Sequence, residues 1–100
     1  MKKVLLISIP VIATTILSKR MVDAAKKQRL DIELTTLAEA EGLARINEFD
    51  VLLLPPYLRY LLNRRKNLGA KRELVIKVID SVPFGNLDGE AVLKIITDAA

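Results

Sequence analysis

The chain has 100 residues and a mass of 11.1 kDa, which is the size of one domain. Hydrophobic residues make up 51% of it and charged residues 28%, so it can bury one core and does not have the composition of a disordered tail. The absence of cysteine and histidine excludes disulfides, thiolate nucleophiles and the commonest general base and metal ligand. We therefore expect neither a cofactor nor a metal.

The net charge is +4, and one segment, residues 59–77, concentrates it. This basic segment contains one acid, Glu73, and seven bases: Arg59, Arg64, Arg65, Lys66, Lys71, Arg72 and Lys77. Such a segment could contact an acidic protein, a nucleic acid or an anionic substrate, but the favoured interpretation is a solvated helix face. Aromatic residues are only 4% of the chain, so we expect no nucleic-acid partner.

The N-terminal run from Val4 to Leu17 is mostly apolar and follows Lys2 and Lys3, as in the first part of a signal peptide. No small-x-small cleavage motif follows it, and it is shorter than the roughly 20 apolar residues of a membrane span. We expect a strand leading into a helix, in a cytoplasmic protein without direct membrane insertion.

The first predicted strand, Val4–Ile9, is almost entirely apolar, which is typical of a strand covered on both faces, and Pro10 ends it. A helix should follow from about Ile12 to Arg29, because apolar residues recur there at helical spacing. Its predicted inner side is Ile16, Leu17, Met21, Ala24, Ala25 and Gln28.

The next strand, Asp31–Thr36, alternates in polarity and predicts an edge strand. Thr36 and Glu39 fit a capping box that would open a short helix to about Asn47. Val51–Leu54 predicts a third, fully buried strand.

Pro55 and Pro56 stop that strand, and Pro56 suits the first turn of a helix that should end near Gly69. The predicted inner side of this helix is Leu58, Leu61, Leu62 and Leu68. A fourth strand, Leu74–Ile79, precedes a loop at Ser81–Leu87. Asp88 is then the expected cap of a last helix that buries Val92, Leu93, Ile96 and Ala99.

Strands and helices thus alternate over residues 1–100 without a linker or repeat, which predicts a single α/β domain with a parallel sheet covered on both faces. Ligands of such sheets bind at the carboxyl ends of the strands. The candidate loops are therefore Ser8–Thr15, Pro55–Tyr57 and Ser81–Leu87.

Several separated motifs resemble the IIB component of the lactose/cellobiose (chitobiose) class of the bacterial phosphoenolpyruvate-dependent sugar phosphotransferase system (PTS). They are Lys2–Ile7, Asp50–Leu54 with Pro56, Arg59–Leu62, Val78–Asp80, Phe84–Gly85, and Asp88–Gly89 with Val92–Leu93. The resemblance covers essentially the whole chain. It implies a flavodoxin-like three-layer sandwich with a four-stranded parallel sheet in the order 2-1-3-4.

The resemblance also implies a site. In the family, a cysteine after the first strand takes a phosphoryl group from a histidine of the IIA component and passes it to the sugar held by the membrane IIC component. Ser8 occupies that acceptor position here. The implied phosphate-binding loop is Ile9, Val11, Ile12, Ala13, Thr14 and Thr15, and the neighbouring cleft is Pro55, Pro56, Tyr57, Tyr60 and Phe84.

The sequence departs from the family pattern at this site. Val11 and Pro55 stand where glycine is usual, and Ala13 where serine is usual. A serine hydroxyl needs an adjacent base to attack, whereas a thiol at a helix N-terminus ionises readily. We therefore expect phosphoryl relay through Ser8 to be weak or absent. Ser8 is either an engineered replacement in a phosphocarrier or a natural residue of a diverged, non-catalytic interaction or regulatory module.

Two other phosphate-handling classes do not fit. A response-regulator receiver needs carboxylates after the first strand and an aspartate after the third, and a low-molecular-weight tyrosine phosphatase needs Cys and Arg around its phosphate loop. Neither pattern is present. Asp80 and Asp88 lie near the predicted cleft and are interpreted as a loop residue and a helix cap.

Overall fold

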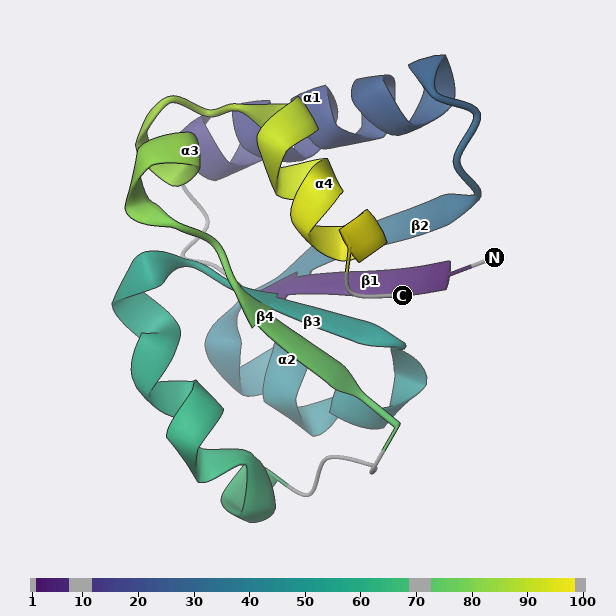
Figure 1. Ribbon diagram of the computed structural model, residues 1–100. Helices are drawn as coiled ribbons and strands as arrows, with labels where there is room; N and C mark the ends of the chain where they lie inside the picture. The colour runs from purple at the N-terminus through teal and green to yellow at the C-terminus, as the bar shows by residue number, and fades with distance from the viewer. Residues whose placement is uncertain (1, 8–11, 69–72, 99–100) are drawn as a thin grey trace.

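The computed structural model describes residues 2–7, 12–68 and 73–98, with side chains except at 12–14 and 63–68 (Figure 1). Strands and helices alternate along the chain, as predicted. The elements are β1 (Lys2–Ile7), α1 (Ile12–Lys27), β2 (Ile32–Leu37), α2 (Glu39–Ala44), η1 (Ile46–Glu48), β3 (Val51–Leu54), η2 (Pro56–Leu68), β4 (Val75–Val78), α3 (Ser81–Gly85) and α4 (Gly89–Asp98).

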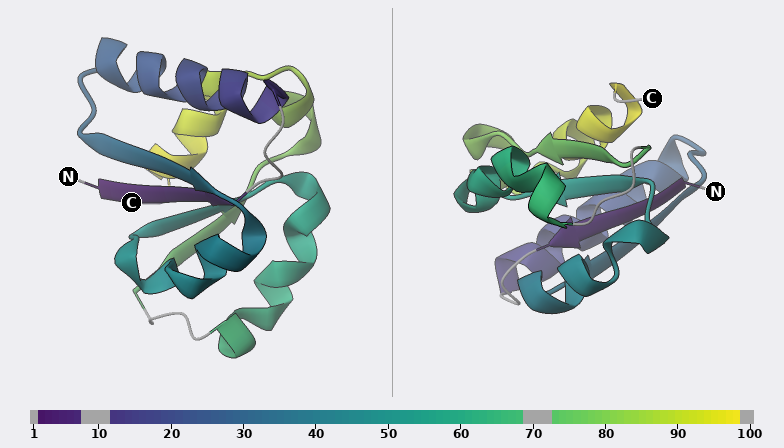
Figure 2. Two further views of the ribbon diagram at one scale, coloured as in Figure 1. Left: turned by 180° about the vertical axis from the view of Figure 1, so that it is seen from behind. Right: turned by 90° about the horizontal axis from the view of Figure 1, so that it is seen from below.

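The four strands form one parallel sheet in the order β2-β1-β3-β4. Val4 of β1 lies between Leu34 of β2 and Val51 of β3, and Val51 pairs in turn with Val75 of β4. Helices α1 and α4 cover one face of the sheet, and α2 and η2 cover the other (Figure 1). Figure 2 shows the same three layers from behind. The predicted α/β class and strand order are confirmed.

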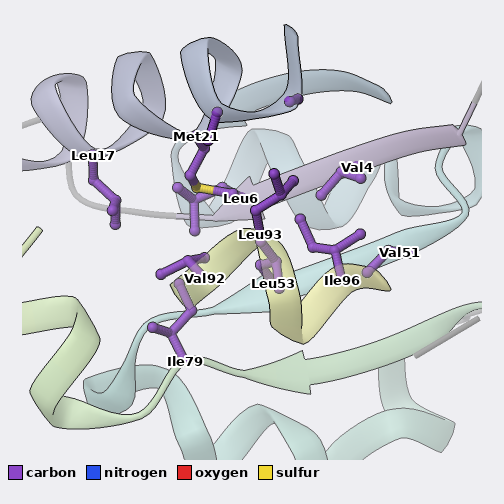
Figure 3. Packing of buried hydrophobic residues seen from close by; sticks show 12 residues of the cluster. Val4, Leu6, Leu17, Met21, Val51, Leu53, Ile79, Val92, Leu93 and Ile96 are labelled. Atoms are coloured by element: carbon purple, nitrogen blue, oxygen red, sulfur yellow. The ribbon is translucent and has the colours of Figure 1, made fainter. Parts of the chain in front are cut away.

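The two central strands supply both halves of the core. Val4 and Leu6 of β1 and Leu53 of β3 point toward α1 and α4, where they meet residues such as Met21 and Leu93 (Figure 3). The alternate residues of the same strands point to the other face and pack on a second cluster: Leu5, Ile7, Leu52, Leu54, Ile46, Phe49, Leu58 and Leu61. Because both faces are covered there, Val4–Ile7 of β1 and Val51–Leu54 of β3 are apolar at every position, whereas Lys2 and Lys3 at the start of β1 are not fully buried.

Helix α1 buries a narrower stripe than predicted. Leu17, Met21, Ala24 and Ala25 are buried as expected, but Ile16 is 37% exposed and Gln28 is exposed. Successive helical residues are separated by about 100° around the axis, so Ile16 lies beside the stripe that contains Leu17. Gln28 follows the last helical residue and belongs to the turn into β2.

The predicted capping box is wrong. Thr36 belongs to β2, and its hydroxyl lies 3.0 Å from that of Ser18 on α1. The residue that precedes α2 is Ala38, which has no side-chain oxygen to cap the helix. A capping box needs its hydroxyl residue directly before the helix, and here β2 continues one residue past Thr36.

Helix α2 ends at Ala44 instead of the predicted Asn47, and the short 3₁₀ helix η1 follows it.

An exposed ion pair links the residues after α2. The guanidinium of Arg45 donates to both carboxylate oxygens of Glu48, at 3.1 and 3.2 Å. These hydrogen bonds raise the pKa of Arg45 and lower the pKa of Glu48. The lowered carboxyl pKa gives a stabilisation that is present above the ordinary pKa of glutamate and lost as the pH falls through the lowered value. It is small, because both side chains face water.

The segment after β3 is a 3₁₀ helix, η2, rather than the predicted α-helix. Its first bond runs from the Leu58 N–H to the Pro55 carbonyl at 3.0 Å, a three-residue step. With three residues per turn, Leu58 and Leu61 lie on one side and Leu62 is rotated away. Leu61 is accordingly 4% exposed and Leu62 is 42% exposed. The prediction of Leu62 as an inner residue is wrong, and the side chain of Leu68 is outside the description.

The neighbouring leucines Leu61 and Leu62 test this rotation. Leu61→Ala should lower the free energy of unfolding by about 2–4 kcal/mol because it opens a cavity in the core. Leu62→Ala should change it by less than about 0.5 kcal/mol, as expected at an exposed position. Chemical denaturation of both variants gives the two values, and similar losses would contradict the three-residue period.

The predicted loop at Ser81–Leu87 contains a short helix, α3, which spans Ser81–Gly85. Asp88 then caps α4 as predicted, since its carboxylate accepts the Ala91 N–H at 3.1 Å. The inner residues of α4 are Val92, Leu93 and Ile96, as predicted, and Ala99 lies outside the described residues.

Gly89, the first residue of α4, lies against the backbone of α1. A Cβ atom at this position would be 2.5 Å from the carbonyl carbon of Arg20 and 2.7 Å from the amide nitrogen of Met21. Real Cβ atoms do not approach backbone this closely, so only glycine allows the two helices this contact.

Two glycines give a matched test of this close approach. Gly89→Ala should lower the free energy of unfolding by about 1–3 kcal/mol, because α1 and α4 must separate. Gly85→Ala adds a Cβ with nothing within 4 Å and should leave stability unchanged or slightly raised. Thermal unfolding of the two variants measures both changes in stability. An equal loss of stability in the two variants would contradict the described packing of α4 on α1.

Candidate functional site

The carboxyl ends of the inner strands meet at one edge of the sheet. Leu6 of β1 pairs with Leu53 of β3, and the Ile79 N–H donates to the Leu54 carbonyl at 2.8 Å. These bonds bring the segments after β1, β3 and β4 together. We call this side of the molecule the carboxyl edge.

The predicted acceptor position lies in the segment between β1 and α1. Ser8, Ile9 and Val11 are outside the described residues, so the predicted acceptor and the start of its loop stay predictions. The loop residues that the structure does describe open α1. Ile12, Ala13 and Thr14 form its first residues, without described side chains, and Thr15 is exposed.

The N-terminus of helix α1 lies at the carboxyl edge, since only four residues separate the end of β1 at Ile7 from the start of α1 at Ile12 (Figure 1). It is 16 residues long and has no acidic residue in its first turn. A helix N-terminus presents free N–H groups and a partial positive charge, which favour an anion.

The predicted cleft residues divide into two groups. Pro55 is buried directly after β3, and Pro56 begins η2, as predicted. The ring of Tyr57 lies edge-on to that of Phe84 in α3, with centroids 6.2 Å apart and planes at 68°. Tyr60 instead donates its hydroxyl hydrogen to Glu39 of α2, at 3.0 Å. The structure thus brings Tyr57 and Phe84 together and binds Tyr60 to a different neighbour.

Apolar side chains are exposed on the three elements that begin at the carboxyl edge, namely α1, η2 and α3. Val82 is 71% exposed, and Tyr57 and Tyr60 are each 46% exposed. Among the residues whose side chains are described, Ile16 and Leu62 are the other exposed large apolar residues. The contact between Tyr57 and Phe84 joins η2 to α3, so Tyr57 and Val82 are exposed on adjoining elements, as at a protein contact surface. Helical spacing predicts burial for Leu62 and Ile16, and the segment around Val82 is predicted as a loop, so the exposure of these three residues is evident only from the structure.

The polar part of the same edge is a cavity of about 180 Å³ beside the start of η2. Its lining includes Arg59, Asp80 and Ser81. A larger cavity, of about 470 Å³, lies between α1 and the start of α4, around Arg20 and Asp88. Over residues 2–7, 12–68 and 73–98, no group of three or more potential metal-ligating side chains occurs.

The predicted basic segment is described only at its ends. Arg59 on η2 and Lys77 on β4 are exposed, and Glu73 is exposed between them. The side chains of the other five bases are outside the description, so a basic surface stays a prediction. Within the described ranges no helix has the length and apolar character needed to cross a membrane.

A parallel sheet in the order 2-1-3-4, with a helix N-terminus at the end of β1, defines a class of small flavodoxin-like α/β proteins. Two solved structures place the chain within that class. The cellobiose-specific phosphotransferase IIB component of Borrelia burgdorferi matches 98% of this chain and 90% of its own, with a TM-score of 0.78 and 25% identity.

The lactose-specific IIB component domain of the phosphoenolpyruvate:carbohydrate PTS from Streptococcus pneumoniae matches 98% of this chain and 96% of its own. Its TM-score is 0.70 at 15% identity, which is a likeness of fold. No family model matches the sequence, and no curated protein matches it either. The resemblance to cellobiose- and lactose-class IIB components is confirmed by these structural neighbours.

The contact between Tyr57 and Phe84 can be measured by a double-mutant cycle. Replacing both rings by leucine should show a coupling of about 0.5–1.5 kcal/mol in the free energy of unfolding, as for other edge-to-face pairs. Tyr60 is equally exposed but binds Glu39, so the cycle of Tyr60→Leu with Phe84→Leu should be additive. Equal coupling in the two cycles would mean that α3 is not held by Tyr57.

Proposed function

We propose that the chain, as a single domain over residues 1–100, is a IIB-like component of a lactose- or cellobiose-class sugar PTS. The observation that carries this proposal is the match of 98% of the chain to a cellobiose-specific IIB component at a TM-score of 0.78. Its partners are then a IIA phosphohistidine donor and a membrane IIC component, and its location is the cytoplasm. Ser8, which precedes α1 in the sequence, is the proposed acceptor position.

Relay through Ser8 is impaired for a chemical reason. In the family reaction the N–P bond of a IIA phosphohistidine breaks as an S–P bond forms on the IIB cysteine, and a sugar oxygen then displaces that sulfur. The thiolate is an adequate nucleophile at neutral pH, particularly at a helix N-terminus. A serine hydroxyl needs a base to remove its proton, and the sequence has no histidine. Any phosphoserine would be an ordinary oxygen ester and a poor donor.

A second candidate function is a non-catalytic IIB-like module that binds a partner without transferring phosphate. The exposed apolar residues of the carboxyl edge favour it, because they supply a contact surface that does not depend on Ser8. Tyr57 on η2 and Val82 on α3 belong to this surface. Both candidates use the same edge, and phosphoryl transfer distinguishes them.

Phosphorylation by the upstream carriers separates the two functions. The protein and its Ser8→Cys variant are incubated with radiolabelled phosphoenolpyruvate, the general phosphocarriers and a IIA component. We expect label on the Ser8→Cys variant and none on the unchanged chain, because only the thiolate accepts the group. Ser18→Cys provides the matched control, since it places a thiol further along α1, beside Thr36, and should stay unlabelled.

The remaining outcomes decide between the candidates. Absence of label on both the unchanged chain and Ser8→Cys would favour the non-catalytic module. Stable label on Ser8 that passes to a sugar would contradict the proposed impairment. Label on Ser18→Cys equal to that on Ser8→Cys would contradict the position of the acceptor site.

A further inference from the structure

The cavity of about 180 Å³ at the carboxyl edge is not used by the proposed phosphoryl transfer. It lies between the first turn of η2 and the junction of β4 with α3. Its lining is Pro56, Arg59, Val78, Ile79, Asp80 and Ser81, none of which belongs to the predicted phosphate loop. Pockets for drug-sized molecules begin at about 300 Å³, so a ligand of this cavity is small.

Asp80 and Arg59 bring opposite charges to the cavity without neutralising each other. In the described part of the chain neither residue forms an ion pair. Asp80 occupies the position before α3, where a carboxylate usually caps the helix, yet its side chain makes no capping hydrogen bond. Asp88, at the matching position of α4, does cap its helix. The carboxylate of Asp80 is therefore available to a ligand.

The three polar groups of the cavity have complementary requirements. The guanidinium of Arg59 offers N–H donors in the fork that suits a phosphate or carboxylate. The carboxylate of Asp80 only accepts hydrogen bonds, and the hydroxyl of Ser81 donates or accepts. A bare anion would be attracted by Arg59 but repelled by Asp80. A neutral polyol would satisfy Asp80 and leave Arg59 without its preferred acceptor.

We propose that this cavity binds a small anion that also carries hydroxyl groups, the chemistry of a sugar phosphate. Its phosphate lies against Arg59, and its hydroxyls donate to the carboxylate of Asp80 and exchange hydrogen bonds with Ser81. Nothing in this binding passes through Ser8, so it goes beyond the proposed function and stands whether or not phosphoryl transfer occurs.

Titration followed by two-dimensional amide NMR of the full chain tests the proposal. The probes are glucose 6-phosphate, inorganic phosphate and glucose, at equal ionic strength. Glucose 6-phosphate should give saturable shifts of the Ile79, Asp80 and Ser81 amides. It should bind about tenfold or more tightly than either other probe, because inorganic phosphate lacks the hydroxyls for Asp80 and glucose lacks the phosphate for Arg59. Equal binding of inorganic phosphate, or shifts that do not saturate, would overturn it.

Variants of Arg59 and Asp80 test which part of the ligand each side chain binds, and a variant of Arg45, which does not line the cavity, is the control. Arg59→Gln should weaken glucose 6-phosphate binding about tenfold. Asp80→Asn should reduce the preference for glucose 6-phosphate by strengthening inorganic phosphate, because a like charge is removed. Arg45 follows α2, near the amino ends of the strands, and Arg45→Gln should change neither affinity. Loss of binding in Arg45→Gln as large as in Arg59→Gln would show nonspecific attraction and overturn the site.

Discussion

Burial of the two central strands on both faces is the constraint on which this structure depends. From Val4 to Ile7 in β1 and throughout β3 neither face is polar, so helices must cover each side of the sheet. The chain crosses from one strand to the next parallel one through those helices. The parallel direction then gathers the strand ends at one edge. The candidate site is a consequence of this arrangement, because its residues come from the segments that follow three different strands.

The features predicted from the sequence are those that burial determines. Val51–Leu54 was predicted to the residue, and the start of α1 at Ile12 and the cap at Asp88 were also predicted. The errors fall where local signals compete. The 3₁₀ geometry of η2 is one such case, because hydrophobic spacing alone cannot distinguish a period of 3.0 from one of 3.6 over a few residues.

The candidate site was only partly predictable, for a different reason. Proximity of the segments around Tyr57 and Phe84 follows from parallel topology, and the structure shows their rings in contact. The partner of Tyr60 and the free carboxylate of Asp80 depend on side-chain geometry, which no spacing in the sequence encodes. Val82 is a further example. An apolar residue is usually expected to be buried, but the short helix α3 has no buried residue and leaves Val82 exposed.

The contact of Gly89 with the Arg20 backbone bears on how the protein is made. It makes α4, near the end of the described chain, the packing partner of α1, near its start. While the chain is still being synthesised, α1 and one face of β1 stay uncovered until α4 has left the ribosome. The nascent segment from β1 onward therefore exposes apolar surface until residues 89–98 have been synthesised, as in other folds whose contacts join distant parts of the sequence.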